Sequence, residues 1–273
     1  MFDRQVRIQL KSPEQLALMR AAGLVVADAL AAMRAAVEVG VTTIELDHIA
    51  AGVIRAAGAR PSFLGYHGFP ATICASVNDQ IVHGFPSVQP LRDGDLVSLD
   101  CGAILDGWHG DAAITVGVGE VTPELVELMR VTEESMWQGI AAARAEGRLS
   151  DIGHAVETYV RGQGPYGIVE EYGGHGIGTE MHQDPHVLNH GRPGRGPGLK
   201  VGMALAIEPM VTLGRPKTEV LDDDWTVVTV DGSYAAHFEH SIAITADGPK
   251  VLTAPRDDPR ALTDSGPAAH RRW

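Results

Sequence analysis

The sequence predicts an α+β fold made of two related halves. Nine residues that begin at Ser12, SPEQLALMR, recur from Thr122 as TPELVELMR, with the proline, glutamate and Leu-Met-Arg in the same helical phase. Strand-like apolar runs follow both copies. Self-similarity on this scale favours two packed units, each a pair of helices followed by antiparallel strands. Common capping chemistry at two unrelated helix starts is the alternative.

The helix starts are well marked. Ser12-Pro13-Glu14 combines a capping hydroxyl, a proline at the first helical position and an acid near the positive end of the helix. QLALMRAAGLVVADALAAMRAA continues this helix, and second helices are expected around LDHI and IGHAV. We expect one domain over residues 1–255, with half-repeats at about 12–120 and 121–252. Residues 256–273 lack apolar periodicity and predict a flexible tail.

The composition is that of a globular protein with a sizeable core, since 44% of the 273 residues are hydrophobic. A formal net charge of −13, with no Lys/Arg cluster beyond Arg271-Arg272, argues against nucleic acid as the main ligand. The two cysteines, Cys74 and Cys101, belong to no CxxC pair, so we expect neither a disulfide nor structural zinc.

The chain is expected to lie in the cytoplasm without a membrane partner. Its longest apolar stretch, residues 21–33, is interrupted by Asp28 and is expected to be too short to cross a bilayer. The opening MFDRQVRIQL lacks the apolar core of a signal peptide.

A β-hairpin is predicted over LVSLDCGAILDGWHGDAAITVG. Asp106-Gly107 is a dipeptide that two-residue type I′ turns prefer, because both central residues need a positive φ. Leu105 and Trp108 are then the pair that flanks the turn, and this choice fixes the register of both strands.

Two acids converge in that register. Asp100 is expected opposite Ala113, and Asp111, two residues before Ala113, projects from the same face as a diagonal neighbour. Bare carboxylates so placed would repel unless a cation lay between them. A solvated hairpin with two surface acids is the alternative.

Three further segments place ionisable side chains in apolar surroundings. GGHGIGTEMHQDP carries His175 and His182 on a glycine-rich stretch, which is expected to let the backbone approach a ligand closely. VGMALAIEPM holds Glu208 at the end of an apolar run that Pro209 terminates, and AAHFEHSIAIT holds Glu239. A buried glutamate often pairs with an arginine, but no matching basic residues lie beside these in the sequence.

With Asp100 and Asp111, these residues predict a metal centre. Ligation dominated by carboxylates, with one imidazole and no thiolate, favours Mn, Fe or Co over structural zinc. Four carboxylates carry more negative charge than one divalent ion needs, which indicates two ions roughly 3.5–4 Å apart. His83, in CASVNDQIVHGFP, is either a core histidine or, beside such a site, a group that hydrogen-bonds the substrate.

The chain resembles the methionine aminopeptidases in the order and local sequences of five residues: Asp100, Asp111, His175, Glu208 and Glu239. The resemblance covers about residues 12–252 and rests on GYHGFPATICASVN, HGFP, SLDCGAILDGWHGDAAIT, GHGIG, AIEPM and FEHSIAIT. Two features resemble the type I bacterial form. The connection from His182 to Glu208 is short, and the chain begins almost at the first helix. The resemblance implies the pita-bread, or creatinase-like, fold, with two related halves around a central sheet.

The resemblance also implies a role for each ligand. Asp100 would chelate one ion, and Asp111 and Glu239 would bridge both. His175 and Glu208 would complete the other ion's site. Glu208 would in addition take the proton of the water that the ions activate.

Around the metal centre the resemblance implies a substrate site. His182 would stabilise the tetrahedral intermediate, and His83 would contact the scissile amide. Six residues are expected to form an apolar slot for a methionine side chain, whose sulfur packs well against aromatic edges. Ordinary core packing is the alternative for these six: Phe63, Tyr66, Phe69, Cys74, Met181 and Trp225.

The predicted function is removal of the initiator methionine from nascent proteins and peptides, with preference for a small second residue. The expected cofactors are two divalent ions, Co, Mn or Fe, with Zn as a further option. A monomer with transient ribosome contact is expected. The rivals are an Xaa-Pro aminopeptidase or dipeptidase, which carries an additional N-terminal domain that this chain is expected to lack, and a catalytically inactive binding module, which would have lost ligands that are present here.

Overall fold

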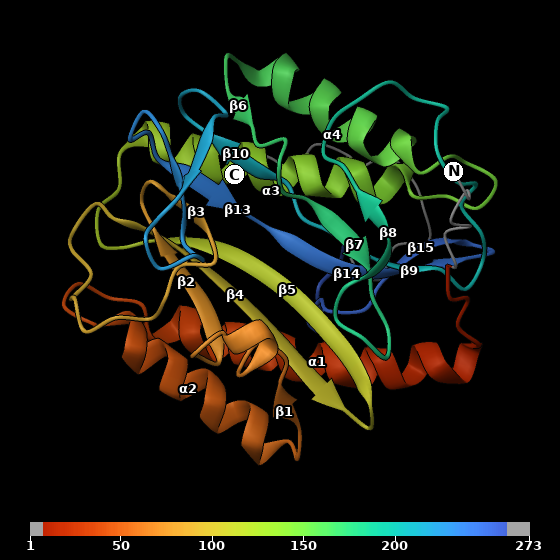
Figure 1. The fold of residues 1–273 in the computed structure, drawn as a ribbon, viewed down its shortest axis with the longest axis horizontal. Coiled ribbons are helices and arrows are strands. Elements are labelled where there is room, and N and C mark those ends of the chain that lie inside the picture. Colours follow the sequence, from red (N-terminus) through yellow and green to blue (C-terminus); the bar gives the residue numbers. More distant parts are fainter. Residues whose placement is uncertain (1–7, 261–273) are drawn as a thin grey trace.

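Two pairs of helices each precede a set of strands in the computed structural model, which describes residues 8–260 (Figure 1). The first part comprises α1 Pro13–Ala36, α2 Thr43–Ala56, β1 Arg60–Pro61, the 3-10 turn η1 Tyr66–Gly68, β2 Ile73–Val77, β3 Gln80–Val82, β4 Leu96–Leu105 and β5 Trp108–Gly117. The second comprises α3 Pro123–Ala142, α4 Ser150–Gln163, β6 Gly167–Ile168, β7 Gly174–Gly176, β8 Gln183–Val187, β9 Ala204–Ile207, β10 Met210–Thr212, β11 Thr218–Val220, β12 Val227–Thr229, β13 Ala235–His237, β14 Glu239–Thr245 and β15 Gly248–Val251. The α+β class predicted from the sequence is confirmed.

The two repeated segments begin their helices by the same chemistry. The Ser12 hydroxyl accepts a hydrogen bond from the Gln15 amide, and the Gln15 side chain in turn accepts one from the Ser12 amide. At α3 the Thr122 hydroxyl accepts from the Leu125 amide. Both helices therefore start where the sequence predicts, with proline at the first helical position.

The central sheet joins strands from both parts of the chain. Its order is β1-β4-β5-β14-β9-β7-β8, with β2 paired to β4 and β15 paired to β14. Two smaller sheets have the orders β13-β10-β6 and β11-β12-β3. In the central sheet the first and second parts of the chain meet where β5 pairs with β14 (Figure 1), and in a smaller sheet β3 pairs with β12.

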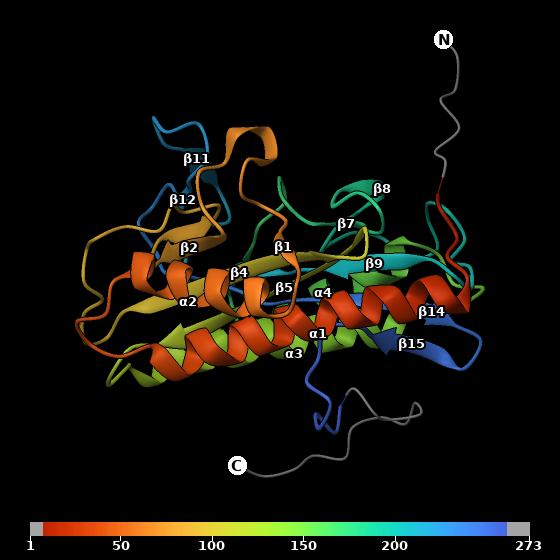
Figure 2. The ribbon, with the colours of Figure 1, turned by 90° about the horizontal axis from the view of Figure 1, so that it is seen from below.

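The two faces of β4 and β5 have different neighbours. Leu99, Cys101 and Ala103 belong to the buried apolar cluster formed with α1 and α2. Because side chains alternate along a strand, Asp100 points to the other face. Figure 2 shows α1 and α3 on one side of the central strands and η1, β11–β12 and β7–β8 on the other. The site described below lies on this second side.

Helix α1 corrects one expectation. It has 24 residues and is apolar enough to cross a membrane by length and composition alone, so the argument from a short stretch around Asp28 was wrong. Half of its apolar window is buried inside the structure, where α1 packs against β4 and β5. This is the setting of a core helix.

The predicted tail is described only at its beginning. Arg260 forms an ion pair with Glu133 of α3, at 2.7 Å, and its guanidinium lies 4.5 Å from the centre of the Trp137 ring. Residues 261–273, like residues 1–7 of the opening segment, lie outside the described residues.

Candidate metal centre and active site

The β4–β5 hairpin brings the first two acids together as predicted. Asp106 and Gly107 both have positive φ, 51° and 82°, and Leu105 pairs with Trp108. Further along the hairpin Asp100 pairs with Ala113. Asp111 therefore shares the Asp100 face, as the turn chemistry predicts.

Strand β14 adds a third carboxylate to this face. Glu239, its first residue, pairs with Ala113. Asp100, Ala113 and Glu239 thus form one row across three neighbouring strands, with the small Ala113 in the middle. Asp111 is the diagonal neighbour of both acids.

Glu208 and His175 reach the same face from β9 and β7. The pairs Ile207↔His240 and Met210↔His237 keep one register on both sides of the break at Pro209, which places Glu208 opposite Glu239. Pro209 ends β9, as expected. Across the next strand pair, Gly176 lies opposite Leu205, so its neighbour His175 shares the Glu208 face.

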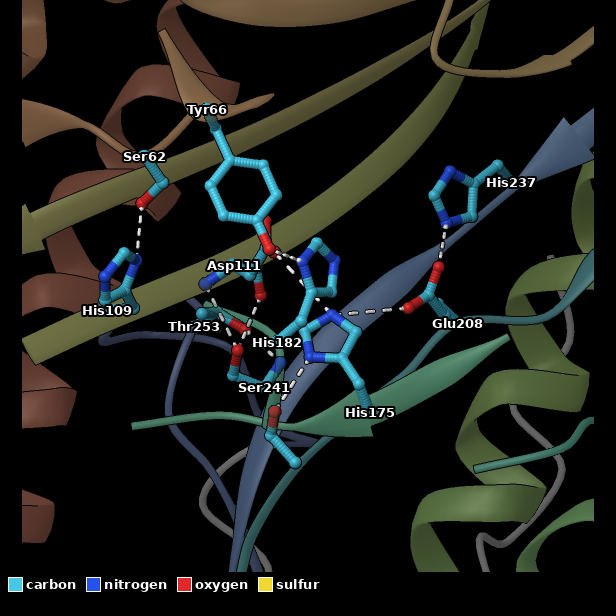
Figure 3. Close-up of polar contacts among 11 residues, drawn as sticks. Ser62, Tyr66, His109, Asp111, His175, His182, Glu208, His237, Ser241 and Thr253 are labelled. Carbon is cyan, nitrogen blue, oxygen red and sulfur yellow. Dashed lines mark hydrogen bonds and ion pairs between the residues drawn. The ribbon is translucent and has the colours of Figure 1, made fainter. Parts of the chain in front are cut away.

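The distances show a tight cluster (Figure 3). His175 Nε2 lies 3.6 Å from Glu208 Oε1 and 4.0 Å from Asp111 Oδ2. Donor atoms of Asp111, His175 and Glu239 all lie within 4.8 Å of one another. The His175 ring makes its other contact through Nδ1, 3.0 Å from the Gly176 carbonyl oxygen. Since a carbonyl only accepts, Nδ1 carries the proton and Nε2 is left as the ligand atom.

One member of the cluster was missed from the sequence. Donor atoms of His237, Glu208 and Glu239 also lie within 4.8 Å of one another, and His237 is buried. The available signal was its position two residues before Glu239, because residues two apart on a strand share a face.

The electrostatics of this cluster fit a bound cation. Asp100 Oδ1, Asp111 Oδ1 and Glu239 Oε1 are buried and have no hydrogen-bond partner among residues 8–260. Burial raises the pKa of Asp100 from 3.8 to about 7. Burial and the neighbouring carboxylates raise the pKa values of Asp111 and Glu239 well above their ordinary values. Such groups need a compensating charge, and hard or borderline divalent ions prefer oxygen and imidazole ligands.

Glu208 differs from the other three acids. Burial by itself would raise its pKa, but His237, His175 and His182 together hold it below the ordinary value. Its main chain is also held, because the buried Asn189 side chain donates a hydrogen bond to the Glu208 carbonyl at 3.0 Å. Glu208 is therefore a fixed anion beside three protonatable acids.

His182 lies beside the cluster, with its ring 4.3 Å from that of His175. Its Nδ1 is 2.8 Å from the Tyr66 hydroxyl. Burial lowers the pKa of His182 to about 4, and burial raises that of Tyr66 above 10. A protonated phenol can donate to a neutral imidazole, so we assign Nδ1 as the acceptor and Nε2–H as the donor that His182 offers to a ligand.

His83 enters the cavity from the end of β3. It follows directly after that strand with φ 62°, a left-handed conformation that non-glycine residues seldom adopt. Tyr172 and Trp225 contact its ring edge to face, with centroids at 5.8 and 6.0 Å. An unusual backbone conformation of this kind is common at functional positions and costs roughly 1–3 kcal/mol.

The six predicted pocket residues lie together. Phe63, Phe69, Cys74 and Met181 form one buried cluster, against which Tyr66 and Trp225 pack. Phe85, which the sequence analysis did not single out, also packs against this cluster. Both cysteines are free, as expected.

A cavity of about 290 Å³ connects these apolar residues with the metal-type cluster. His67 and Val82 line this cavity. Every site residue predicted from the sequence lines it as well: Phe63, Tyr66, Phe69, Cys74, His83, Asp100, Asp111, His175, Met181, His182, Glu208, Trp225 and Glu239. A second, more open cavity of about 630 Å³ shares His175 and His182 with the first. Its wall includes the exposed acids Glu180 and Asp184.

Two glycines near His175 pack closely against the main chain of neighbouring segments. A Cβ on Gly174 would lie 2.2 Å from the Ala206 oxygen, and one on Gly176 would lie 2.2 Å from the Asp184 oxygen. These two glycines let neighbouring main-chain segments approach each other closely. Close strand packing is what places His175 in the cluster.

Comparison with known proteins gives the family. The profile of metallopeptidase family M24 matches residues 17–246. This chain belongs to metallopeptidase family M24. Membership in it implies divalent metal ions as cofactors, and the carboxylate and histidine cluster offers them a place.

The curated relatives of this M24 chain include methionine aminopeptidases from several bacteria. Methionine aminopeptidase 1 of Mycobacterium tuberculosis is 57% identical over 249 residues, which are 89% of this chain and 94% of that protein. Methionine aminopeptidase 1 of Bacillus subtilis is 48% identical over 243 residues, 89% of this chain and 98% of that protein.

Solved structures agree. The methionine aminopeptidase from Rickettsia prowazekii superposes with a TM-score of 0.89 at 40% identity, covering 90% of this chain and all of that one. The Pyrococcus furiosus prolidase, at 20% identity and a TM-score of 0.72, shares the fold, and this chain covers 66% of it. The pita-bread fold and the resemblance to methionine aminopeptidases are therefore confirmed.

Proposed function

We propose that this chain is a methionine aminopeptidase that hydrolyses the peptide bond after an N-terminal methionine. The observation that carries the proposal is the 290 Å³ cavity, which joins a buried carboxylate and imidazole cluster to an aromatic and sulfur-containing wall. A flexible thioether suits such a wall, because sulfur contacts aromatic edges favourably. The cluster supplies the chemistry beside it.

Two divalent ions fit the ligand set. Asp100 would bind one ion, and His175 and Glu208 would bind the second. Asp111 and Glu239 would bind both ions. When bound, divalent ions acidify water and polarise the scissile carbonyl. Co, Mn and Fe suit the oxygen-rich donors best, and Zn is the further candidate.

The protein's own groups complete the reaction. Glu208, whose pKa is held below its ordinary value, is ionised and accepts the proton of the attacking water. His182 donates its Nε2–H to the oxygen that gains negative charge. His83, held between Tyr172 and Trp225, contacts the scissile amide and assists departure of the amine.

The rest of the substrate needs a way out of the first cavity. The open 630 Å³ cavity begins at His175 and His182, beside the reacting groups, and receives the chain after the cleaved bond. The preference for a small second residue belongs to the proposal as well. We further propose one catalytic domain over residues 1–255, with half-repeats at about 12–120 and 121–252, and a monomer that acts in the cytoplasm on nascent chains with transient ribosome contact.

The test begins with protein stripped by EDTA. Initial rates on Met-Ala-Ser and on a Leu-Pro peptide are measured before and after adding Mn, Co, Fe or Zn singly. Metal-restored cleavage of Met-Ala-Ser supports the proposal, and cleavage of the proline peptide alone would assign the chain to the prolidase type. Failure to cleave either peptide with any metal would contradict enzymatic function.

Asp111→Asn gives the matched variant. Because Asp111 is proposed to bridge both ions, this change is expected to abolish turnover and to reduce bound metal to less than one ion per chain. Asp247→Asn, at an exposed loop acid, is the control and should keep both. Full turnover and metal content in Asp111→Asn would contradict the assignment.

A further inference from the structure

His237 stands in the ligand cluster without a role in the mechanism above. It is the last residue of β13, and its side chain is 1% exposed. Its Nε2 has no hydrogen-bond partner among residues 8–260. The nearest anionic oxygen is Glu208 Oε2, at 3.6 Å. A buried donor aimed at a proposed metal ligand needs an explanation.

The main chain of His237 is fixed from two sides. On one side His237 pairs with Met210 of β10. On the other, the His237 amide donates to Thr115 Oγ1 at 2.8 Å, and the same hydroxyl donates to the His237 carbonyl at 2.9 Å. Ser98 Oγ, 2.9 Å away, completes the contacts of Thr115. The position of the imidazole is therefore set by the strands.

The two oxygens of Glu208 face two different imidazoles. Oε1 lies 3.6 Å from His175 Nε2, and Oε2 lies 3.6 Å from His237 Nε2. Figure 3 shows the carboxylate between the two rings. His175 presents a lone pair at Nε2, so Oε1 and that nitrogen face the same ion. Oε2 of Glu208 points away from that ion, toward His237.

We propose that His237 is a positioning residue for Glu208: its Nε2–H donates to Oε2 and so keeps Oε1 turned toward the ion that His175 binds. The inference rests on the proposed metal centre. A contact of 3.6 Å is slightly longer than a hydrogen bond, and hydrogen bonds that act in catalysis often tighten only when the reacting complex forms. Partners that orient a ligand from outside the coordination shell typically contribute 10–100-fold in metal affinity or activity.

Direct ligation by His237 is the competing geometry, since a ring nitrogen of His237 lies within 4.8 Å of donor atoms of Glu208 and Glu239. The arrangement favours positioning, because the Glu208 carboxylate stands between His237 and His175. The two roles also differ in what can replace the ring. A positioning donor can be replaced by another N–H of similar reach, whereas a ligating nitrogen cannot.

Three variants separate the roles. His237→Gln keeps an amide N–H at similar reach, His237→Asn keeps the amide but draws it back by one methylene, and His237→Leu removes the donor at similar volume. His154→Leu, which removes an imidazole from α4, is the control. If His237→Leu fails to fold, the Gln and Asn pair still decides the question.

The main readouts do not depend on turnover. Metal-stripped proteins are titrated calorimetrically with Mn²⁺, and the visible spectrum of the Co²⁺-loaded proteins is recorded. We expect His237→Gln to stay within about threefold of the unmodified Kd and to keep its spectrum. His237→Asn and His237→Leu should weaken Kd by about 10–100-fold and change the spectrum. The kcat for Met-Ala-Ser should fall in these two variants while KM changes little.

Two outcomes would overturn the inference. Unchanged Kd and spectrum in His237→Leu or His237→Asn would mean that the ring does not orient Glu208. Equal losses in the Gln and Leu variants would make His237 a direct ligand. If the unmodified protein binds Mn²⁺ but does not cleave Met-Ala-Ser, the proposed function fails while the Kd and spectral comparison still decides the role of His237.

Discussion

Replacing Ser241 with alanine should loosen both the fold and the metal centre. The side chain of Ser241 is completely buried on β14. Its hydroxyl accepts a hydrogen bond from the Asp111 amide at 3.1 Å and donates one to the Asp111 carbonyl at 2.8 Å. Strands β5 and β14 pair directly at two positions, Ala113 with Glu239 and Ala112 with His240. At the next position, Asp111, the Ser241 hydroxyl takes the place of direct hydrogen bonds between the two main chains.

The expected loss follows from the two backbone groups that Ser241→Ala leaves unpaired. Each buried unsatisfied group costs roughly 1–3 kcal/mol, so the free energy of unfolding should fall by roughly 2–6 kcal/mol. In a chain of this size each kcal/mol corresponds to roughly 2 °C, and Tm should fall by at least about 4 °C. The metal affinity should fall as well, because the main chain of Asp111 is no longer held.

The measurement is urea unfolding of metal-free protein, followed by calorimetric titration with Mn²⁺. Metal-free protein is needed because bound metal adds its own stabilisation. Ser135→Ala is the matched control, since it removes a completely buried hydroxyl of α3 that donates to the Thr132 carbonyl within the same helix. It should cost about 1 kcal/mol and leave the Kd unchanged. Ser241→Ala within 0.5 kcal/mol of the unmodified protein, a margin ordinary for surface changes, would refute the reasoning.

Two further changes test other parts of the molecule. His182→Ala should keep the affinity for Mn²⁺ and lower kcat for Met-Ala-Ser by roughly 10²–10³, the usual effect of losing one such donor; an unchanged initial rate would remove the proposed role. Lys11→Met should stabilise the protein at pH 7, because burial lowers the pKa of Lys11 from 10.5 to about 8. Between pH 8 and 10.5 the folded state then binds fewer protons than the unfolded state, so the free energy of unfolding rises with pH across that window. Below pH 8 the full cost of burying the charged lysine, at most about 3 kcal/mol, is present. Urea unfolding at pH 7 and pH 10 checks this, with the exposed Lys200→Met as control, and a gain of the same size at both pH values would contradict it.

The hairpin and its acids could be predicted because local rules determine them. A two-residue turn at Asp106-Gly107 fixes the register of the strands that it joins, and a period of two fixes the face of Asp100 and Asp111. The partner strand could not be predicted in the same way. Glu239 pairs with Ala113 from a distant part of the chain, and no local pattern specifies which strand completes a row of carboxylates.

His237 was missed for a related reason. His237 and Glu239 belong to different strands, because β13 ends at His237 and β14 begins at Glu239. Its contact, Glu208, lies at a second interruption, before Pro209. Both breaks between strands occur at the same level of the sheet, and the register continues across them. Sequence periodicity is least informative at that level.

The same level of the sheet explains how four carboxylates can be buried. Asp100 and Asp111 come from strands whose other face packs against α1 and α2, so folding of the apolar side carries them inside. Glu208 and Glu239 come from the second part of the chain, the first directly after β9 and the second at the start of β14, which continue the same sheet. On either side of the direct Ala113 pairing, the hydroxyls of Ser241 and Thr115 fasten one part to the other. Apolar packing and these buried hydrogen bonds thus offset the repulsion among the acids.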